Sequence, residues 1–265
     1  CALPICLNKQ VGFLMLYDDV SVKDVVDSES ALEFMKEATK LATSAELENI
    51  GQKLEEKSDL FNSILNPEDI STMSEDDFKK VVGKIFSIRR KSKRLLKANG
   101  FENIRNNMET LLYGDDPIEN RFNHFVDSIE NIEEKMRINF ASELLHFTHP
   151  KKYWLWTNWI WDPDANTGAL PLVVQEDVDL LSETNGGIYR KVGEAIIFVN
   201  AVGHAKSFSS MGRGLFGTDV LLACVYAVYM YTVFKVKLSQ EFNRILPELP
   251  ELTQRVLGVH NLEKN

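Results

Sequence analysis

The chain has 265 residues, of which 44% are hydrophobic and 26% charged, so a largely disordered protein is excluded and an ordinary soluble globular protein is expected. Only 14 glycines and 8 prolines are present, too few for the turns of an all-β protein of this length. The net charge of −9 argues against a general nucleic-acid binder, and three cysteines cannot form a disulfide framework, which favours a reducing, cytoplasmic location.

The N-terminal part of the chain is expected to be helical and rich in charge. Apolar residues recur there at helical spacing, and turn or capping residues separate the runs. Pro117 begins the clearest helix, because Asp115 and Asp116 precede it and one of them can cap. The helices predicted from these patterns cover residues 28–60, 74–99, 101–113 and 117–148.

The chain changes character after residue 151, where turn formers and all four tryptophans gather. The predicted fold is all-α and bundle-like, with a small β-hairpin or extended segment near 153–175. The run from Val220 to Phe234 is apolar but too short to cross a bilayer, so a buried central helix is expected over 219–236. Further predictions are a helix over 188–202, a loop rich in Gly and Ser over 203–218, a polar helix or turn near 238–246, and a last helix after Pro250.

The predicted domain boundary lies near residue 115. It divides an N-terminal helical region, 1–114, from a C-terminal helical core, 115–265, that holds the tryptophans and the buried helix. A single domain is the alternative.

A basic stretch over 79–97 is the first candidate for function. Nine of its 19 residues are Lys or Arg, in a chain that is acidic overall. If the stretch is helical, Arg90, Arg94 and Lys97 fall on one stripe, and with Arg89 they are the expected partner-binding residues. The alternative is a solvated helix face that pairs with acids elsewhere, among them Glu130, Glu133 and Glu134.

The second candidate is the group of tryptophans at 154, 156, 159 and 161. The spacing of two around Thr-Asn predicts a hairpin with Trp154 and Trp156 on one face. Clustered tryptophans can stack a flat ligand or anchor a protein interface, and they are also ordinary core residues. We therefore take Trp154, Trp156, Trp159 and Trp161 as candidate ligand-binding residues.

The third candidate is Glu143-x-x-His146-x-x-His149, whose members lie broadly on one side of a helix. Glu and His at this spacing occur in di-iron bundles, but those need a second such pair and two more carboxylates. A single-metal site would need a further ligand such as His204 or His124. His149 can also complement the negative end of the helix dipole, so no metal and no other cofactor is expected.

The loop before the buried helix could hold an anion. Gly212, Arg213 and Gly214 lie just before a helix N-terminus, where free N–H groups and a guanidinium suit a phosphate. The pattern matches neither a P-loop nor a dinucleotide-binding fingerprint, and Thr218 or Asp219 more simply caps the helix.

Catalytic groups are only weakly indicated. Asp162 lies beside the tryptophans, in a stretch that is also ordinary turn chemistry. With His204 and His146 it is a candidate for proton transfer. No recognised catalytic motif is present, and a non-enzyme is favoured.

The function expected from the sequence is that of a non-catalytic adaptor or a subunit of a multiprotein complex, with a protein partner. One alternative is an enzyme or binding protein for a small anionic ligand, with a pocket between the tryptophans and the glycine-rich loop. Another is nucleic-acid binding through a basic helix at 79–97, which the overall charge disfavours.

Overall fold

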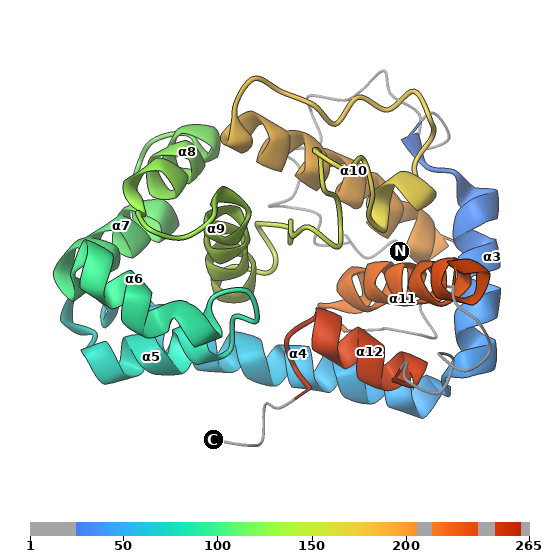
Figure 1. Cartoon of the computed structure of the whole chain (residues 1–265), viewed down its shortest axis with the longest axis horizontal. Coiled ribbons are helices and arrows are strands. Elements are labelled where there is room, and N and C mark those ends of the chain that lie inside the picture. The colour runs from blue at the N-terminus through green and yellow to red at the C-terminus, as the bar shows by residue number, and fades with distance from the viewer. Residues whose placement is uncertain (1–24, 206–213, 238–246, 261–265) are drawn as a thin grey trace, which may run out of the picture.

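The computed structural model describes residues 25–205, 214–237 and 247–260 of the chain (Figure 1). Within these ranges every regular element is helical, which confirms the all-α prediction. The α-helices are α3 (Ser28–Leu41), α4 (Ser44–Leu65), α5 (Glu75–Gly83), α6 (Ser92–Asn99), α7 (Phe101–Tyr113), α8 (Ile118–Ser128), α9 (Glu134–Thr148), α10 (Asn185–Ala205), α11 (Gly217–Lys237) and α12 (Leu249–Val256). Short 3-10 helices cover Ile70–Thr72, Arg89–Lys91 and Leu170–Leu172.

The helices surround a central one, α9. Figure 1 shows α5 to α8 at one end of the molecule, α3, α11 and α12 at the other, and α4 running between the two ends. Helix α4 packs against α9, and Phe61 meets Phe147 edge to face at 5.6 Å between ring centres. Buried apolar side chains from both sides of residue 115 belong to one hydrophobic core. A division near that residue stays a prediction.

Helix α11 confirms the first part of the buried helix expected over 219–236. Its side chains from Val220 to Val225 are all buried, whereas Tyr231 is partly exposed and Thr232 is exposed. A helix segment that is surrounded by core needs no amphipathic pattern, which agrees with the uniformly apolar sequence of this part. Within the described ranges no helix combines the length and the apolar character needed to cross a membrane.

The helix predicted over 28–60 is in fact two helices, α3 and α4. They separate at Ala42, which has extended backbone angles. Thr43 then begins α4 with a capping box: the Glu46 backbone N–H donates to Thr43 Oγ1 at 3.3 Å, and the Thr43 N–H donates to the Glu46 carboxylate at 2.8 Å. The break lets α3 turn away and pack against α11.

The helix predicted over 74–99 is also divided, and this corrects the expected basic helix at 79–97. Helix α5 ends at Gly83, turns and a 3-10 helix follow, and α6 begins at Ser92. Ile85 and Ile88 lie in the break and are fully buried. Because the chain leaves the helical path here, the stripe of Arg90, Arg94 and Lys97 on one continuous helix is lost.

The third division falls in the helix predicted over 117–148. Helix α8 ends at Ser128 and α9 begins at Glu134. Asn131 between them has a φ of 61°, in the left-handed region that asparagine tolerates better than most residues. Ile129 and Ile132 on either side are buried, so the helical spacing of these residues reflects the core and not one long helix.

Residues 153–175, all of them described, contain no β-hairpin strands. The segment is irregular and crosses the core, with Leu155 buried. At its end it pairs with the start of the described chain through an isolated antiparallel bridge between Val26 and Val174. A second isolated bridge, between Asp162 and Thr167, closes a turn. Large residues alternate in this segment because some of them are buried, and not because the segment pairs with itself as a hairpin.

Candidate functional site

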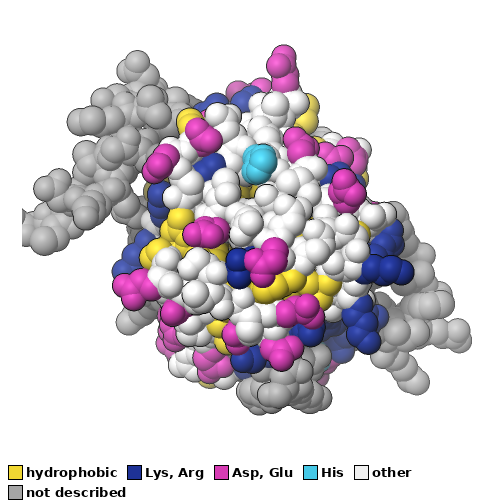
Figure 2. Space-filling model, turned by 90° about the vertical axis from the view of Figure 1, so that its left-hand side faces the viewer, with side chains coloured by type: hydrophobic (Ala, Val, Ile, Leu, Met, Phe, Trp, Pro, Cys, Tyr) yellow, Lys and Arg dark blue, Asp and Glu magenta, His cyan; other side chains and the backbone are white. Residues whose placement is uncertain are grey.

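The basic stretch forms a compact surface at the end of the molecule that carries α5 to α8. We define the basic surface as Arg89, Arg90, Lys93, Arg94 and Lys97. All of these side chains are exposed except that of Arg89, which is partly exposed. Figure 2 shows Lys and Arg side chains gathered toward one edge of this end, with Asp and Glu scattered over the rest.

The basic surface concentrates several positive charges that lack counter-ions. Among the described residues, none of its five side chains forms an ion pair. Lys91, which lies between them, bonds to Glu133 at 2.7 Å. This hydrogen bond lowers the pKa of Glu133 below its usual value, and the charges of Lys91 and Arg94 add smaller effects. Cations elsewhere on the described surface pair with nearby acids; they include Lys40, Lys79, Lys80, Lys135, Arg190, Lys191 and Arg255.

An aromatic side chain accompanies these free cations. Phe86 is 54% exposed, although large hydrophobic residues are normally buried. The guanidinium of Arg89 lies 4.7 Å from the centre of its ring, a cation–π distance. The backbone turn that buries Ile85 and Ile88 on either side of it presents Phe86 outward.

Glu143 belongs to a buried ion pair that the sequence did not indicate. Lys57 of α4 is fully buried, and its Nζ lies 2.7 Å from Glu143 Oε2. The same ammonium lies 4.0 Å from the centre of the Phe147 ring and 3.4 Å from the carbonyl oxygen of Leu257. Burial raises the pKa of Glu143, and the charge of Lys57 opposes this effect.

His146 forms a second buried pair, with Asp219 of α11. Its Nε2 lies 3.1 Å from Asp219 Oδ1, and its Nδ1 lies 2.9 Å from the Tyr153 carbonyl oxygen. Nδ1 must carry a proton to donate to that carbonyl, and Nε2 must carry one to face a carboxylate favourably. The imidazolium fits both contacts. Burial alone would lower the pKa of His146, but Asp219 and the carbonyl raise it above its usual value.

These two pairs explain the Glu143, His146 and His149 pattern. Glu143 and His146 each face their own counter-ion from another helix, while His149 packs edge to face on Tyr113 at 5.4 Å between ring centres. Among the described residues there is no group of three His, Cys, Asp or Glu side chains placed to hold a metal ion. The sequence indicates Asp219 only as a helix cap, and Lys57 gives no signal beyond a charge within an apolar helix face.

The tryptophan segment is fully described, and its four side chains differ in exposure; their use as ligand-binding residues stays a prediction. Trp156 and Trp161 are buried, and Trp154 and Trp159 are partly exposed. Trp156 donates from its indole Nε1 to the Trp161 carbonyl at 3.0 Å and packs on Phe122 at 6.0 Å. None of the ring contacts joins two tryptophans; Trp159 lies 6.2 Å from Tyr226. The segment therefore contributes mainly to the core.

The other candidate residues are dispersed. Asp162 accepts hydrogen bonds from Lys135 at 2.8 Å; burial raises its pKa, but Lys135 and Asn158 lower it below the usual value, so the carboxylate stays ionised. Gly214 is exposed. Gly212 and Arg213 lie outside the described residues, as does the side chain of His204 at the end of α10, so convergence of the glycine-rich loop with the tryptophans stays a prediction.

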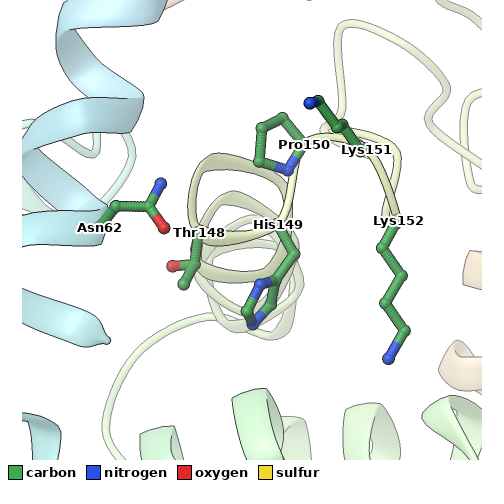
Figure 3. A pocket seen from close by; sticks show the side chains of 6 residues that line it. All are labelled: Asn62, Thr148, His149, Pro150, Lys151 and Lys152. Carbon is green, nitrogen blue, oxygen red and sulfur yellow. The ribbon is translucent and has the colours of Figure 1, made fainter. Parts of the chain in front are cut away.

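A hollow of 310 Å³ lies where α9 ends (Figure 3). Asn62 of α4 lines one side, and the residues from Thr148 to Lys152 line the other. No tryptophan and no carboxylate belongs to its lining. Comparison with known protein families, with curated proteins and with solved structures finds no match to this chain.

Proposed function

We propose that the chain is a non-catalytic subunit or adaptor that docks an acidic segment of a protein partner on the basic surface beside Phe86. The observation that carries this proposal is the local concentration of unpaired charge: the five cations of the basic surface lie within nine residues of the chain and form no ion pair among the described residues, while Lys40, Lys79, Lys80 and Lys91 pair with nearby acids. An exposed aromatic ring next to free arginines is the composition that protein interfaces favour.

The charge distribution favours a protein over a long nucleic acid. The stretch from 79 to 97 holds nine of the 30 basic residues and no acidic one, so the remainder has 21 basic residues against 39 acidic ones. A long polyanion would meet this negative remainder on either side of the basic surface. A short acidic segment with an apolar residue for Phe86 would avoid the repulsion and use both features.

The internal ion pairs argue against a catalytic role for Glu143 and His146. Both side chains are buried, and each is engaged by its counter-ion. A group that transfers protons to a substrate has to reach it, directly or through one water. We assign these residues to stability and the basic surface to function, in a protein that we place in the cytoplasm.

The proposal can be tested by fluorescence anisotropy with two labelled probes of equal charge. One is a 16-residue Glu-rich peptide with one leucine face, and the other is single-stranded DNA. We expect the peptide to bind more tightly than the DNA, and binding to weaken with salt. The triple variant Arg90→Ser, Arg94→Ser and Lys97→Ser should lower peptide affinity about tenfold, since each exposed charge pair contributes about 0.2–1 kcal/mol.

Two further variants complete the test. Phe86→Ala should lower peptide affinity at least about fivefold, the effect of truncating an anchor aromatic. The control removes the exposed charges of Lys36, Lys40 and Lys79, on α3 and α5, and changes net charge equally. It should leave peptide binding within about twofold. Equal weakening by the control, tighter binding of the DNA, or no peptide binding at low salt would each overturn the proposal.

A further inference from the structure

The hollow at the end of α9 carries a second inference, independent of the basic surface. Two lysines, Lys151 and Lys152, extend from the turn that follows the helix, and both are exposed. Neither forms an ion pair among the described residues; Lys152 lies over the Tyr153 ring at 5.0 Å. The lining therefore has two available positive charges and, as noted above, no carboxylate.

Thr148 is the feature that distinguishes this hollow from an ordinary surface depression. Its side chain is 3% exposed, and its Oγ1 has no hydrogen-bond partner. A buried hydroxyl without a partner costs about 1–3 kcal/mol, and most buried polar groups avoid this cost. A threonine near a helix end can bond to a carbonyl one turn earlier, but Thr148 does not. A ligand oxygen in the hollow would supply the missing partner.

The opposite wall of the hollow is held rigidly. The Asn62 amide nitrogen donates to the carbonyl oxygens of Ser58 at 2.9 Å and Phe147 at 3.2 Å. This leaves the Asn62 Oδ1 as an acceptor, and Figure 3 shows the Asn62 and Thr148 side chains pointing toward one another from α4 and α9. A ligand with both an anionic oxygen and a hydroxyl could use both walls.

The two lysines act against the electrostatic effect of the helix that ends at the hollow. The end of α9 presents the negative end of a helix dipole, which disfavours negative charge. His149 adds no charge, because burial and the nearby Lys152 and Arg121 lower the pKa of its imidazole. The two lysines carry full charges and the helix end about half of one, so the lysines outweigh the dipole, and their hydrogen bonds to phosphate oxygens would be charge-assisted.

We propose that this hollow binds a small phosphorylated molecule that carries a neighbouring hydroxyl. Its phosphate contacts Lys151, Lys152 and the Thr148 hydroxyl, and its own hydroxyl donates to Asn62 Oδ1. The volume of 310 Å³ is at the lower end of the range for small-molecule sites, which suits a ligand of this size. The lysines are exposed and free to turn toward the phosphate, while Thr148 and Asn62 are fixed.

Calorimetric titration with glycerol 3-phosphate, inorganic phosphate and glycerol tests this site. Glycerol 3-phosphate should bind more tightly than phosphate, and glycerol should not bind. Thr148→Val, which keeps the side-chain shape, should lower affinity for glycerol 3-phosphate about tenfold. It should also raise the melting temperature of the ligand-free protein, because it removes an unpartnered buried hydroxyl. These opposite effects separate a ligand role from a structural one.

A charge-matched pair of variants separates this site from general attraction of anions. Lys151→Gln with Lys152→Gln should abolish binding of glycerol 3-phosphate. Lys36→Gln with Lys40→Gln, two exposed positions of α3 outside both proposed sites, should leave it unchanged, so this result is independent of the proposed partner docking. Equal losses in the two double variants, unchanged binding in Thr148→Val, or a lower melting temperature of that variant would overturn the proposal.

Discussion

The buried pair of Lys57 and Glu143 allows a strong prediction about stability. Replacing Lys57 with methionine keeps an unbranched side chain of similar length among apolar neighbours, but leaves the Glu143 carboxylate 6% exposed without its ammonium partner. Removing one member of a buried pair costs about 3–5 kcal/mol. We expect a loss of about 3 kcal/mol in the free energy of unfolding, near the lower limit, because the positive charge of His146 still favours the carboxylate.

The loss should depend on pH. Without Lys57 the pKa of Glu143 rises further, since the charge and the hydrogen bond of Lys57 both lower it. A group whose pKa is higher in the folded state than in the unfolded state stabilises the fold at low pH, and this contribution is lost as the pH rises through the folded value. The variant should therefore lose more stability at pH 8 than at pH 5.5, measured by urea denaturation.

A double-mutant cycle identifies the cause of the loss. Lys57→Met combined with Glu143→Met should cost much less than the sum of the two single changes, because the double variant leaves no unpaired buried charge. The control is Lys36→Met on the exposed face of α3, which should change stability by less than about 0.5 kcal/mol. A loss from Lys57→Met no larger than this control, or the same at both pH values, would refute the reasoning.

Two further predictions concern the second buried pair and the backbone. The pKa of His146 is raised in the folded state, so its pairing with Asp219 stabilises the fold fully below the pKa of the unfolded state, about 6.5, and less as the pH rises through the pKa of the folded state. The difference in free energy of unfolding between the wild type and His146→Gln should therefore be larger at about pH 6 than at about pH 9. A difference that increases with pH would contradict this prediction. Gly168→Ala should lower the melting temperature sharply, because Gly168 has a φ of 142° and an added Cβ would lie 2.4 Å from the Ile160 carbonyl oxygen. Gly51→Ala within α4, where no atom lies within 4 Å of an added Cβ, should raise stability by about 0.5–1 kcal/mol, and similar effects of the two alanines in thermal melts would refute this reading.

The sequence predicted the limits of a helix correctly where the residues next to the helix begin or end it. Helix α7 occupies residues 101–113 as expected, because Gly100 and Gly114 flank an amphipathic run. The division after Ala42 could also have been found, since Thr43 and Glu46 have the spacing of a capping box. That signal lies within the sequence and was obscured by the continuous helical spacing of apolar residues around it.

Other breaks depend on the tertiary structure alone. Ile85, Ile88, Ile129 and Ile132 keep a helical spacing in the sequence although they lie in turns. They are buried because several helices converge on them, and the chain bends so that each one enters the core. The spacing of apolar residues predicts which residues are buried, but it does not predict whether they lie in one helix or in two.

The candidate site shows the same division between sequence and fold. The sequence by itself determined a mostly helical chain with one apolar, largely buried helix and a concentrated positive charge in an acidic protein. Only the tertiary structure decided that Glu143 and His146 are neutralised by Lys57 and Asp219, which lie 86 and 73 residues away along the chain. It also decided which cations lack counter-ions. The physical reason is that electrostatic pairing depends on distance in space, which no local pattern of residues specifies.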